Sequence, residues 1–318
     1  MKQSVILFAA ALAFAACSQD SEDRSQDSNI IQLSAAISGG DGVKAGTRAA
    51  AADALQNTQF ESGKVIHVEA YDHTTGNTYY QSTGNYTTGA GGAMTGSLYY
   101  PASGNNVDLK AFYPSTIASN STEFEVNASQ TTDNIANYQS SDLMYIKKSE
   151  ASNLAKGNTI HPLTFYHAMS QIIVNITNGE GVEATDITSK VTAVKILNTV
   201  RQASLSIDTN GEITPSAKNV AASDITITGS GASNVGLIVP QEVAGGTNFI
   251  SITYTGHTGD FVYALPAGEA KTFAKGTKYI YTFELSAAGI QLKSLTITDW
   301  AADPAAVEGN SGSGDFTI

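Results

Sequence analysis

The chain has 318 residues, a formal net charge of −12 and 14% charged residues. This acidic balance argues against nucleic acid or an anionic membrane surface as a partner, because phosphate contacts need clustered Lys or Arg. Hydrophobic residues make up 42% of the chain and fall in short β-type runs, which is typical of an exported all-β protein. The length suggests two domains of roughly 150 residues each.

Residues 1–16 are predicted to form a lipoprotein signal peptide. An apolar run over residues 5–16 is shorter than the roughly 20 residues of a membrane-spanning helix but typical of a signal peptide. It ends in Phe14-Ala15-Ala16-Cys17, which resembles a bacterial lipobox, although an aliphatic residue is commoner than Phe14. Cys17 is the only cysteine, so no intrachain disulfide can form, and lipidation accounts for it better than a free exported thiol. The alternative is an ordinary signal peptide with an incidental cysteine.

Residues 17–29 are expected to form an acidic tether. This segment has no apolar residue after Cys17 and carries four acidic residues against one arginine, Arg24, so it predicts a solvated spacer. An acidic stretch here resembles the surface-export signal of lipoproteins from Gram-negative gut and oral anaerobes. A flexible periplasmic tether is the alternative.

The first strand is predicted at residues 30–37. Its alternation places Ile31, Leu33, Ala35 and Ile37 on one face. A Gly-rich turn then leads to Arg48-Ala49, flanked by small residues.

Arginine is rare outside this leader. The chain has three arginines, at 24, 48 and 201, against 14 lysines. An arginine-specific protease would therefore trim the leader and find almost nothing to cut in the body, although chance alone could produce the same skew.

The body shows recurring strand signals, with β-branched and aromatic residues in alternation. Turn clusters separate them, and Asn210-Gly211 is the strongest hairpin signal because this pair readily takes positive φ angles. The pattern predicts antiparallel β-sandwiches rather than a parallel sheet. A boundary at 178–181 would give domains over 30–178 and 179–318. The predicted strands are 64–71, 97–100, 107–113, 143–147, 160–166, 171–177, 191–197, 203–208, 225–228, 235–239, 249–255, 261–265, 279–285 and 292–298.

Residues with the spacing of an active site are not evident. The five histidines show no metal-ligand spacing, and no nucleophile elbow of the GxSxG kind is present. The Gly-rich segment 89–96 lacks the lysine of a phosphate loop and is interpreted as a mobile surface loop. We therefore expect no catalytic residue, no metal and no cofactor, and we expect that the chain is not an enzyme.

Several short motifs resemble the fimbrillin (Mfa-like) family, the type V pilus subunits of Gram-negative anaerobes. They are Ala111-Phe112-Tyr113-Pro114, Asp142-Leu143-Met144-Tyr145, the run from His161 to Ser170, and Ile297-Thr298-Asp299-Trp300. The resemblance covers most of the chain. It implies two tandem transthyretin-like antiparallel β-sandwich domains, a lipoprotein precursor, and an adhesive surface filament formed with other pilin subunits as a homo- or hetero-polymer.

The resemblance also implies an assembly mechanism. Cys17 would anchor the precursor in the outer membrane, and an arginine-specific protease would cut between Arg48 and Ala49. Removal of residues 30–48 would then free the first strand and open a groove for a neighbour's C-terminal strand. A plain loop arginine is the alternative. Phe316 and Ile318 would share a face of such a donor strand, but the sequence leaves open whether this subunit is a stalk, tip or anchor.

A non-polymerising surface lipoprotein that binds a glycan or another host ligand is the second hypothesis. Its loops are rich in tyrosine, a residue that stacks on sugars but is also common in sandwich cores. The residues concerned are Tyr79, Tyr80, Tyr86, Tyr99 and Tyr100.

Overall fold

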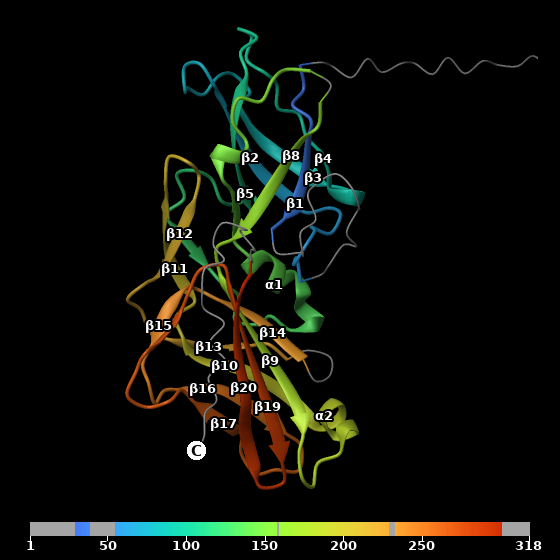
Figure 1. The fold of residues 1–318 in the computed structure, drawn as a ribbon, viewed down its shortest axis with the longest axis vertical. Coiled ribbons are helices and arrows are strands. Elements are labelled where there is room, and N and C mark those ends of the chain that lie inside the picture. Colours follow the sequence, from blue (N-terminus) through green and yellow to red (C-terminus); the bar gives the residue numbers. More distant parts are fainter. Residues whose placement is uncertain (1–28, 39–54, 158, 229–232, 301–318) are drawn as a thin grey trace, which may run out of the picture.

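The computed structural model describes residues 29–38, 55–157, 159–228 and 233–300. The described chain is built almost wholly from β-strands, arranged as two units stacked along the long axis of the molecule (Figure 1). Cys17, Arg48, Ala49 and the tail 301–318 lie outside the described residues. Among the helices that the structure describes, none is long and apolar enough to cross a membrane.

The N-terminal unit is a closed barrel in the order β1-β4-β3-β2-β5-β7-β8. Strand β1 pairs with β4 on one side and β8 on the other. Without β1, the remaining six strands would form an open sheet with β4 and β8 as its edges. The strands are β1 (Leu33–Ile37), β2 (Val65–Asp72), β3 (Thr83–Thr88), β4 (Ala93–Thr95), β5 (Val107–Tyr113), β7 (Met144–Ile146) and β8 (His161–His167).

The C-terminal unit is a sandwich of two four-stranded sheets. One has the order β14-β9-β19-β20 and the other β13-β10-β16-β17. Their strands are β9 (Ser170–Asn178), β14 (Ser233–Ile238), β19 (Thr277–Ser286) and β20 (Gly289–Asp299), and β10 (Val191–Thr199), β13 (Ser223–Thr226), β16 (Asn248–Tyr254) and β17 (Phe261–Ala264).

Smaller elements flank this sandwich. The predicted hairpin at Asn210-Gly211 is confirmed, because β11 pairs antiparallel with β12 and Gly211 has φ +81°. The remaining strands are β6 (Glu123–Glu125), β11 (Gln202–Ile207), β12 (Ile213–Ala217), β15 (Gln241–Val243) and β18 (Lys271–Phe273). The helices are α1 (Ile135–Ser141) and α2 (Ala184–Lys190), with 3₁₀ turns η1 (Ala90–Gly92), η2 (Thr132–Asn134) and η3 (Lys148–Glu150).

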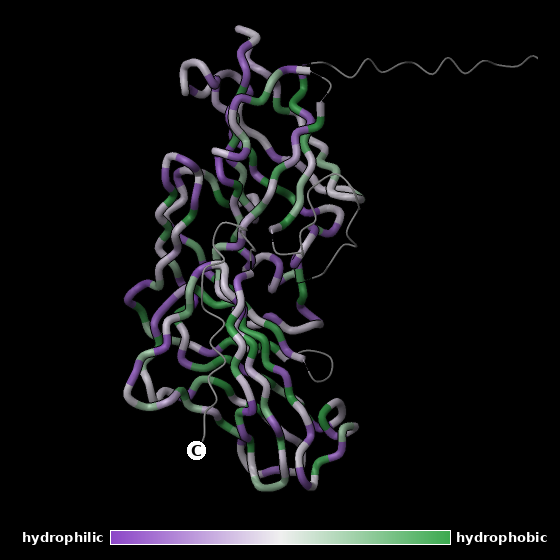
Figure 2. The backbone as a smooth tube through the Cα atoms, viewed as in Figure 1, coloured by the Kyte–Doolittle hydropathy of each residue, from purple (hydrophilic) through white to green (hydrophobic). Residues whose placement is uncertain are grey.

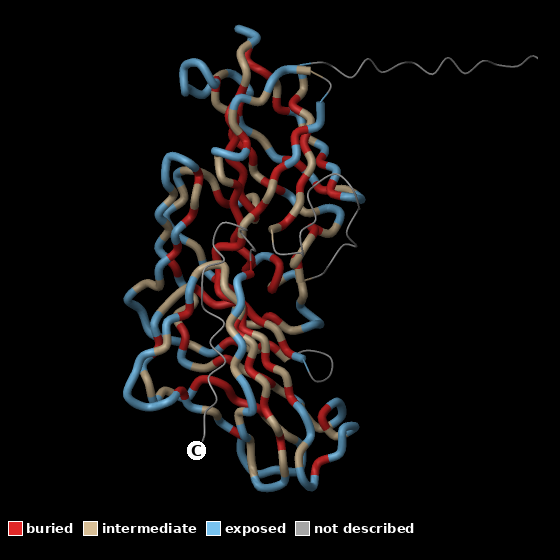
Figure 3. Tube along the Cα trace, in the orientation of Figure 1, coloured by how far each residue is buried: buried red, intermediate tan, exposed pale blue. Residues whose placement is uncertain are grey.

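Each unit has its own hydrophobic core, one within the barrel and one between the facing sheets. Hydrophobic residues gather on the strands of the sandwich, and hydrophilic residues on the outer turns (Figure 2). Buried residues follow the middle of both units, while exposed residues mark the turns at their ends (Figure 3). Strand β19 shows the cause, since its buried positions alternate with partly exposed ones and supply Tyr281 and Phe283 to the core.

Two features differ from the sequence-based expectation. The pairs β1–β8 and β9–β19 are parallel, so the sheets are mixed rather than purely antiparallel. Strand β9, which was expected to end the first domain, pairs with β14 and β19 instead. Its buried residues Ile172 and Val174 belong to the C-terminal core. The chain therefore changes sheet at Ala168-Met169, ahead of the boundary predicted after residue 178.

Candidate functional site: the seat of strand β1

Strand β1 lies in a surface of the barrel that we call the strand seat, formed by β4, β8, the segment Leu98–Tyr100 and Tyr86 of β3. The alternating side chains of the strand, and that of Ile31 just before it, point into the core, where Ile31, Leu33, Ala35 and Ile37 are at most 6% exposed. The residues between them are half-buried. Burying the three large side chains, those of Ile31, Leu33 and Ile37, stabilises this segment in its seat by about 5–9 kcal/mol in total.

The β8 side of the seat is continuous. Parallel pairing runs without interruption from Leu33 opposite His161 to Ile37 opposite Phe165. Backbone hydrogen bonds extend it at both ends, since His161 N–H donates to the Gln32 carbonyl (2.9 Å) and Ser38 N–H donates to the Phe165 carbonyl (2.8 Å).

The β4 side is interrupted. Leu33 pairs with Met94 and Ser34 with Ala93. Pairing resumes two residues before β1 begins, where Ile31 N–H donates to the Leu98 carbonyl at 2.8 Å. Three residues of the opposite chain, 95–97, lie between these two contacts, so the chains separate there.

A side chain bridges this interruption. The Tyr86 hydroxyl donates to the Ile31 carbonyl at 2.6 Å, and burial raises the pKa of Tyr86 well above its ordinary value. A Cβ at Gly96 would lie only 2.5 Å from the Tyr86 ring, so the ring can reach Ile31, just before β1, because residue 96 has no side chain. A hollow of about 450 Å³ remains beside these residues; no charged residue lines it, and the exposed Ile160 lies at its rim.

Glycine also determines the opposite end of β4. Gly92 has φ +80°, and a Cβ there would lie 2.4 Å from the Ala35 carbonyl oxygen. Only glycine combines this backbone conformation with such a close approach. The interpretation of residues 89–96 as a mobile surface loop was therefore wrong, because they form η1 and β4 and hold β1 in place.

Comparisons with known proteins agree with this architecture. A family model described as fimbrillin-like matches residues 47–300. The chain belongs to the fimbrillin-like family. A Bacteroides uniformis protein named "Putative fimbrium subunit Fim1C" is 26% identical over 314 residues, covering 94% of this chain and 96% of the relative.

Solved structures show the same fold. A cell adhesion protein from Bacteroides uniformis, described as putative, superposes with a TM-score of 0.62 at 23% identity, covering 86% of this chain and all of that one. A second, from Bacteroides ovatus, has the same TM-score at 15% identity and covers 86% of this chain and 98% of its own. Membership of a family of fimbrial structural proteins agrees with the expectation that this fimbrillin is not an enzyme.

The structure describes only some of the residues predicted to act in assembly. It places Ile31, Leu33, Ala35 and Ile37 on one buried face, while Cys17, Arg48 and Ala49 lie outside the described residues. The third arginine of the chain, Arg201, is held in the folded body. Its guanidinium forms an ion pair with Glu125 (2.9 Å) and donates to the Ser223 hydroxyl (2.9 Å).

The tyrosines of the ligand-binding hypothesis do not share an exposed surface. Tyr86 and Tyr100 are core residues, 1% and 4% exposed, whereas Tyr80 is 88% exposed. Tyr79 packs against the barrel core, and its hydroxyl donates to the Tyr99 carbonyl at 2.9 Å. Most of this aromatic content serves the fold of the barrel.

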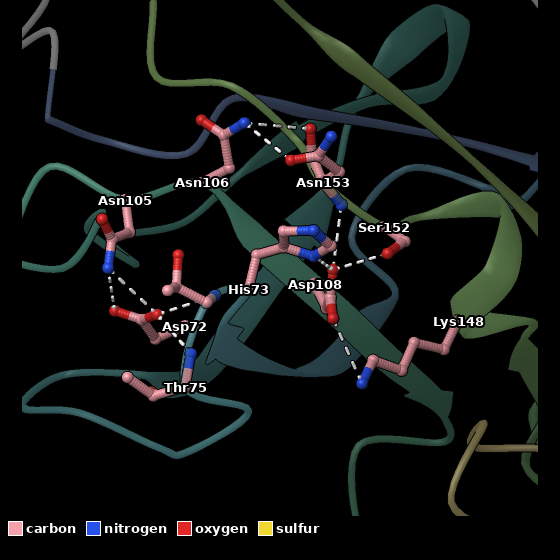
Figure 4. A network of polar contacts seen from close by, with 10 residues as sticks. Asp72, His73, Thr75, Asn105, Asn106, Asp108, Lys148, Ser152 and Asn153 are labelled. Atoms are coloured by element: carbon pink, nitrogen blue, oxygen red, sulfur yellow. Dashed lines mark hydrogen bonds and ion pairs between the residues drawn. The ribbon is translucent and has the colours of Figure 1, made fainter.

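A polar network at one end of the barrel also has a structural explanation (Figure 4). Asp108, whose side chain is 8% exposed, accepts hydrogen bonds from Ser152 (2.6 Å) and His73 (2.7 Å) and pairs with Lys148 (3.2 Å). Burial would raise the pKa of Asp108, but these partners outweigh it and hold the pKa well below its usual range. The network fastens the turns after β2 and η3. Among the described residues, no group of three or more His, Cys, Asp or Glu side chains is placed to hold a metal.

Proposed function

We propose that this fimbrillin is a structural and adhesive subunit of a surface fimbria, and that it polymerises by exchange of strand β1. The observation that carries the proposal is the position of β1. It closes the barrel through pairs on both sides, yet in the sequence it is separated from β2 by residues 38–64, which include Arg48. One cut in that connection would leave β1 attached by noncovalent contacts alone.

Export and anchoring are the first step of the proposal. Residues 1–16 act as the signal peptide, the lipidated Cys17 holds the precursor in the outer membrane, and residues 17–29 form the tether. The two β units then correspond to the tandem transthyretin-like domains implied by the resemblance.

Cleavage between Arg48 and Ala49 is the second step. Small residues flank this bond, so a protease can draw it into an extended conformation. Arg201 is a poor competitor, because its side chain is tied to Glu125 and Ser223 and its carbonyl accepts from Val126 N–H at 3.0 Å. An arginine-specific protease therefore separates the leader from the body without degrading the fold.

Exchange is the third step. Cleavage alone does not eject β1, because its buried side chains still hold it with several kcal/mol. Cleavage does remove the covalent connection between β1 and the body of the barrel. A strand that leaves the seat is then no longer held close to it at a high effective concentration. A strand from another subunit with a similar apolar face can then replace it and pair with the edges of β4 and β8.

The test is the N-terminus of the assembled protein. Parent filaments should contain chains that begin at Ala49, and Arg48→Ala should accumulate as a monomeric precursor that begins at the lipidated Cys17. Arg24→Ala removes an arginine of the same leader and should assemble like the parent. Normal filament formation by Arg48→Ala would contradict the proposal.

A further inference from the structure

The interruption in the β1–β4 pairing leaves one backbone group of the segment just before β1 dependent on a side chain. Ile31 N–H has a backbone acceptor, the Leu98 carbonyl, but the Ile31 carbonyl accepts from the Tyr86 hydroxyl. Tyr86 is 1% exposed, so this hydrogen bond is out of contact with water. A buried hydroxyl or carbonyl left without a partner destabilises the structure.

The seat keeps this requirement for any strand that enters it. When β1 leaves, water can solvate the Tyr86 hydroxyl, but a new strand displaces that water and has to offer an acceptor. Successive carbonyls of a strand point to opposite sides. A slip of one residue therefore turns the carbonyl away from Tyr86 and also turns the apolar face out of the core.

We propose that Tyr86 is a positioning residue of the strand seat, which takes the place of the missing backbone donor and sets where an entering strand from a second copy of this chain lies. The inference deepens the strand exchange proposed above and rests on it. A slip of two residues again brings a carbonyl to Tyr86, so the side chains on the buried face decide between those registers. The uncharged hollow beside Tyr86 and Ile160 favours an entering strand without charge at this point.

Tyr100 provides the matched control. Its hydroxyl is also buried and donates to a backbone carbonyl, that of Ala155, at 2.8 Å. The hydroxyl also lies 2.8 Å from His161 Nε2, and both partners belong to the body of the barrel rather than to residues 29–38. Tyr100→Phe and Tyr86→Phe therefore each remove a buried hydroxyl from the seat, but only Tyr86→Phe removes a hydrogen bond to residues 29–38.

The uncleaved full chain tests the positioning role without any exchange. Hydrogen exchange of the Ile31 amide, which is bonded to Leu98, should be about tenfold faster in Tyr86→Phe than in the parent, because loss of the neighbouring bond loosens the strand locally. Tyr100→Phe should leave this amide unchanged. Equal protection of the Ile31 amide in all three proteins would overturn the proposal.

The cleaved full chain tests the role in exchange. The probe is a labelled synthetic peptide of residues 29–38, added in excess so that it competes with the resident strand. A second peptide has an ester in place of the amide between Ile31 and Gln32, which weakens the Ile31 carbonyl as an acceptor. The loss of affinity caused by the ester should be about fivefold smaller in Tyr86→Phe than in the parent and in Tyr100→Phe, since the two changes act on one hydrogen bond.

The outcomes separate this inference from the proposed function. If the peptide enters and the ester weakens its binding to all three proteins equally, Tyr86 has no positioning role although exchange occurs. If the peptide enters none of them, strand exchange fails, and the amide measurement on the uncleaved chain still decides the role of Tyr86.

Discussion

His167 and Trp300 stack face to face in the interior, with ring centroids 3.6 Å apart and 7° between their planes. His167 ends β8 of the barrel, and Trp300 follows β20 of the sandwich. Asp142 forms a hydrogen bond with the His167 ring, with 2.8 Å between Asp142 Oδ1 and His167 Nδ1. Gln56 Nε2 donates to the other carboxylate oxygen, Asp142 Oδ2, at 3.0 Å. Segments from both units therefore join in one buried cluster.

Trp300→Ala is expected to weaken this junction strongly. Removing a fully buried indole from a packed site costs about 3–5 kcal/mol of unfolding free energy. Urea unfolding followed by circular dichroism measures the loss, since the only tryptophan of the chain is then absent. Tyr80→Ala, which removes a ring that is 88% exposed, should change the stability by less than about 0.5 kcal/mol. A Trp300→Ala protein as stable as Tyr80→Ala would contradict the claim that Trp300 stabilises the junction between the two units.

Asp142→Ala should cost about 3 kcal/mol or more, because it leaves the buried donors of His167 and Gln56 without their acceptor. Asp260→Ala is the matched control. Asp260 also accepts two side-chain hydrogen bonds, from Ser251 (2.7 Å) and Thr253 (2.8 Å), but it lies at the surface. Equal losses in the two variants would show that burial of the cluster has no energetic weight.

The barrel should lose stability in acid through Glu69. Burial alone would raise the pKa of Glu69, but hydrogen bonds from His67, Ser119 and Tyr71 outweigh it and hold the pKa at about 2. The unfolded chain takes up a proton near pH 4.5, ahead of the folded one. The contribution of Glu69, on the order of 3 kcal/mol, is therefore complete above pH 4.5 and falls away toward pH 2. Glu69→Gln should flatten the stability curve in this window, and an unchanged slope would contradict the assignment.

Gly92→Ala should loosen β1 beyond the usual effect of a residue with positive φ. Gly104 is the control, because it has φ +78° and open space around it, whereas a Cβ at Gly92 lies 2.4 Å from the Ala35 carbonyl. Both alanines meet the same backbone strain, so the difference between them reports the clash with β1. We expect Gly92→Ala to be less stable than Gly104→Ala by about 1–3 kcal/mol, with faster hydrogen exchange across residues 33–37. Equal effects would place β1 away from Gly92.

The sequence was sufficient where the signal was local. Alternation alone identified the buried face of β1, and Asn210-Gly211 identified the hairpin between β11 and β12. The role of Gly92 and Gly96 was out of reach, because it depends on the Ala35 carbonyl and the Tyr86 ring, which approach only in the folded barrel.

Sheet membership was equally hard to read. Strand β9 follows β8 after two residues, which suggests a hairpin, yet its partners β14 and β19 lie about 60 and 107 residues further along the chain. Pairing between strands far apart in the sequence leaves no periodic pattern in either strand. The position of the domain boundary and the parallel pairs therefore could not be predicted from the sequence.

The most direct test of strand exchange is a reversible lock on β1. Ser34 and Ala93 are paired neighbours of β1 and β4, within the range of a cross-strand disulfide. The protein is a chain that begins at Ser18 and carries Ser34→Cys and Ala93→Cys. After cleavage at Arg48, the oxidised form should stay monomeric and the reduced form should polymerise. The control, Val65→Cys with Thr87→Cys, joins β2 to β3 and should polymerise when oxidised. Polymerisation of the oxidised Ser34–Ala93 variant at the rate of its reduced form would contradict the release of β1.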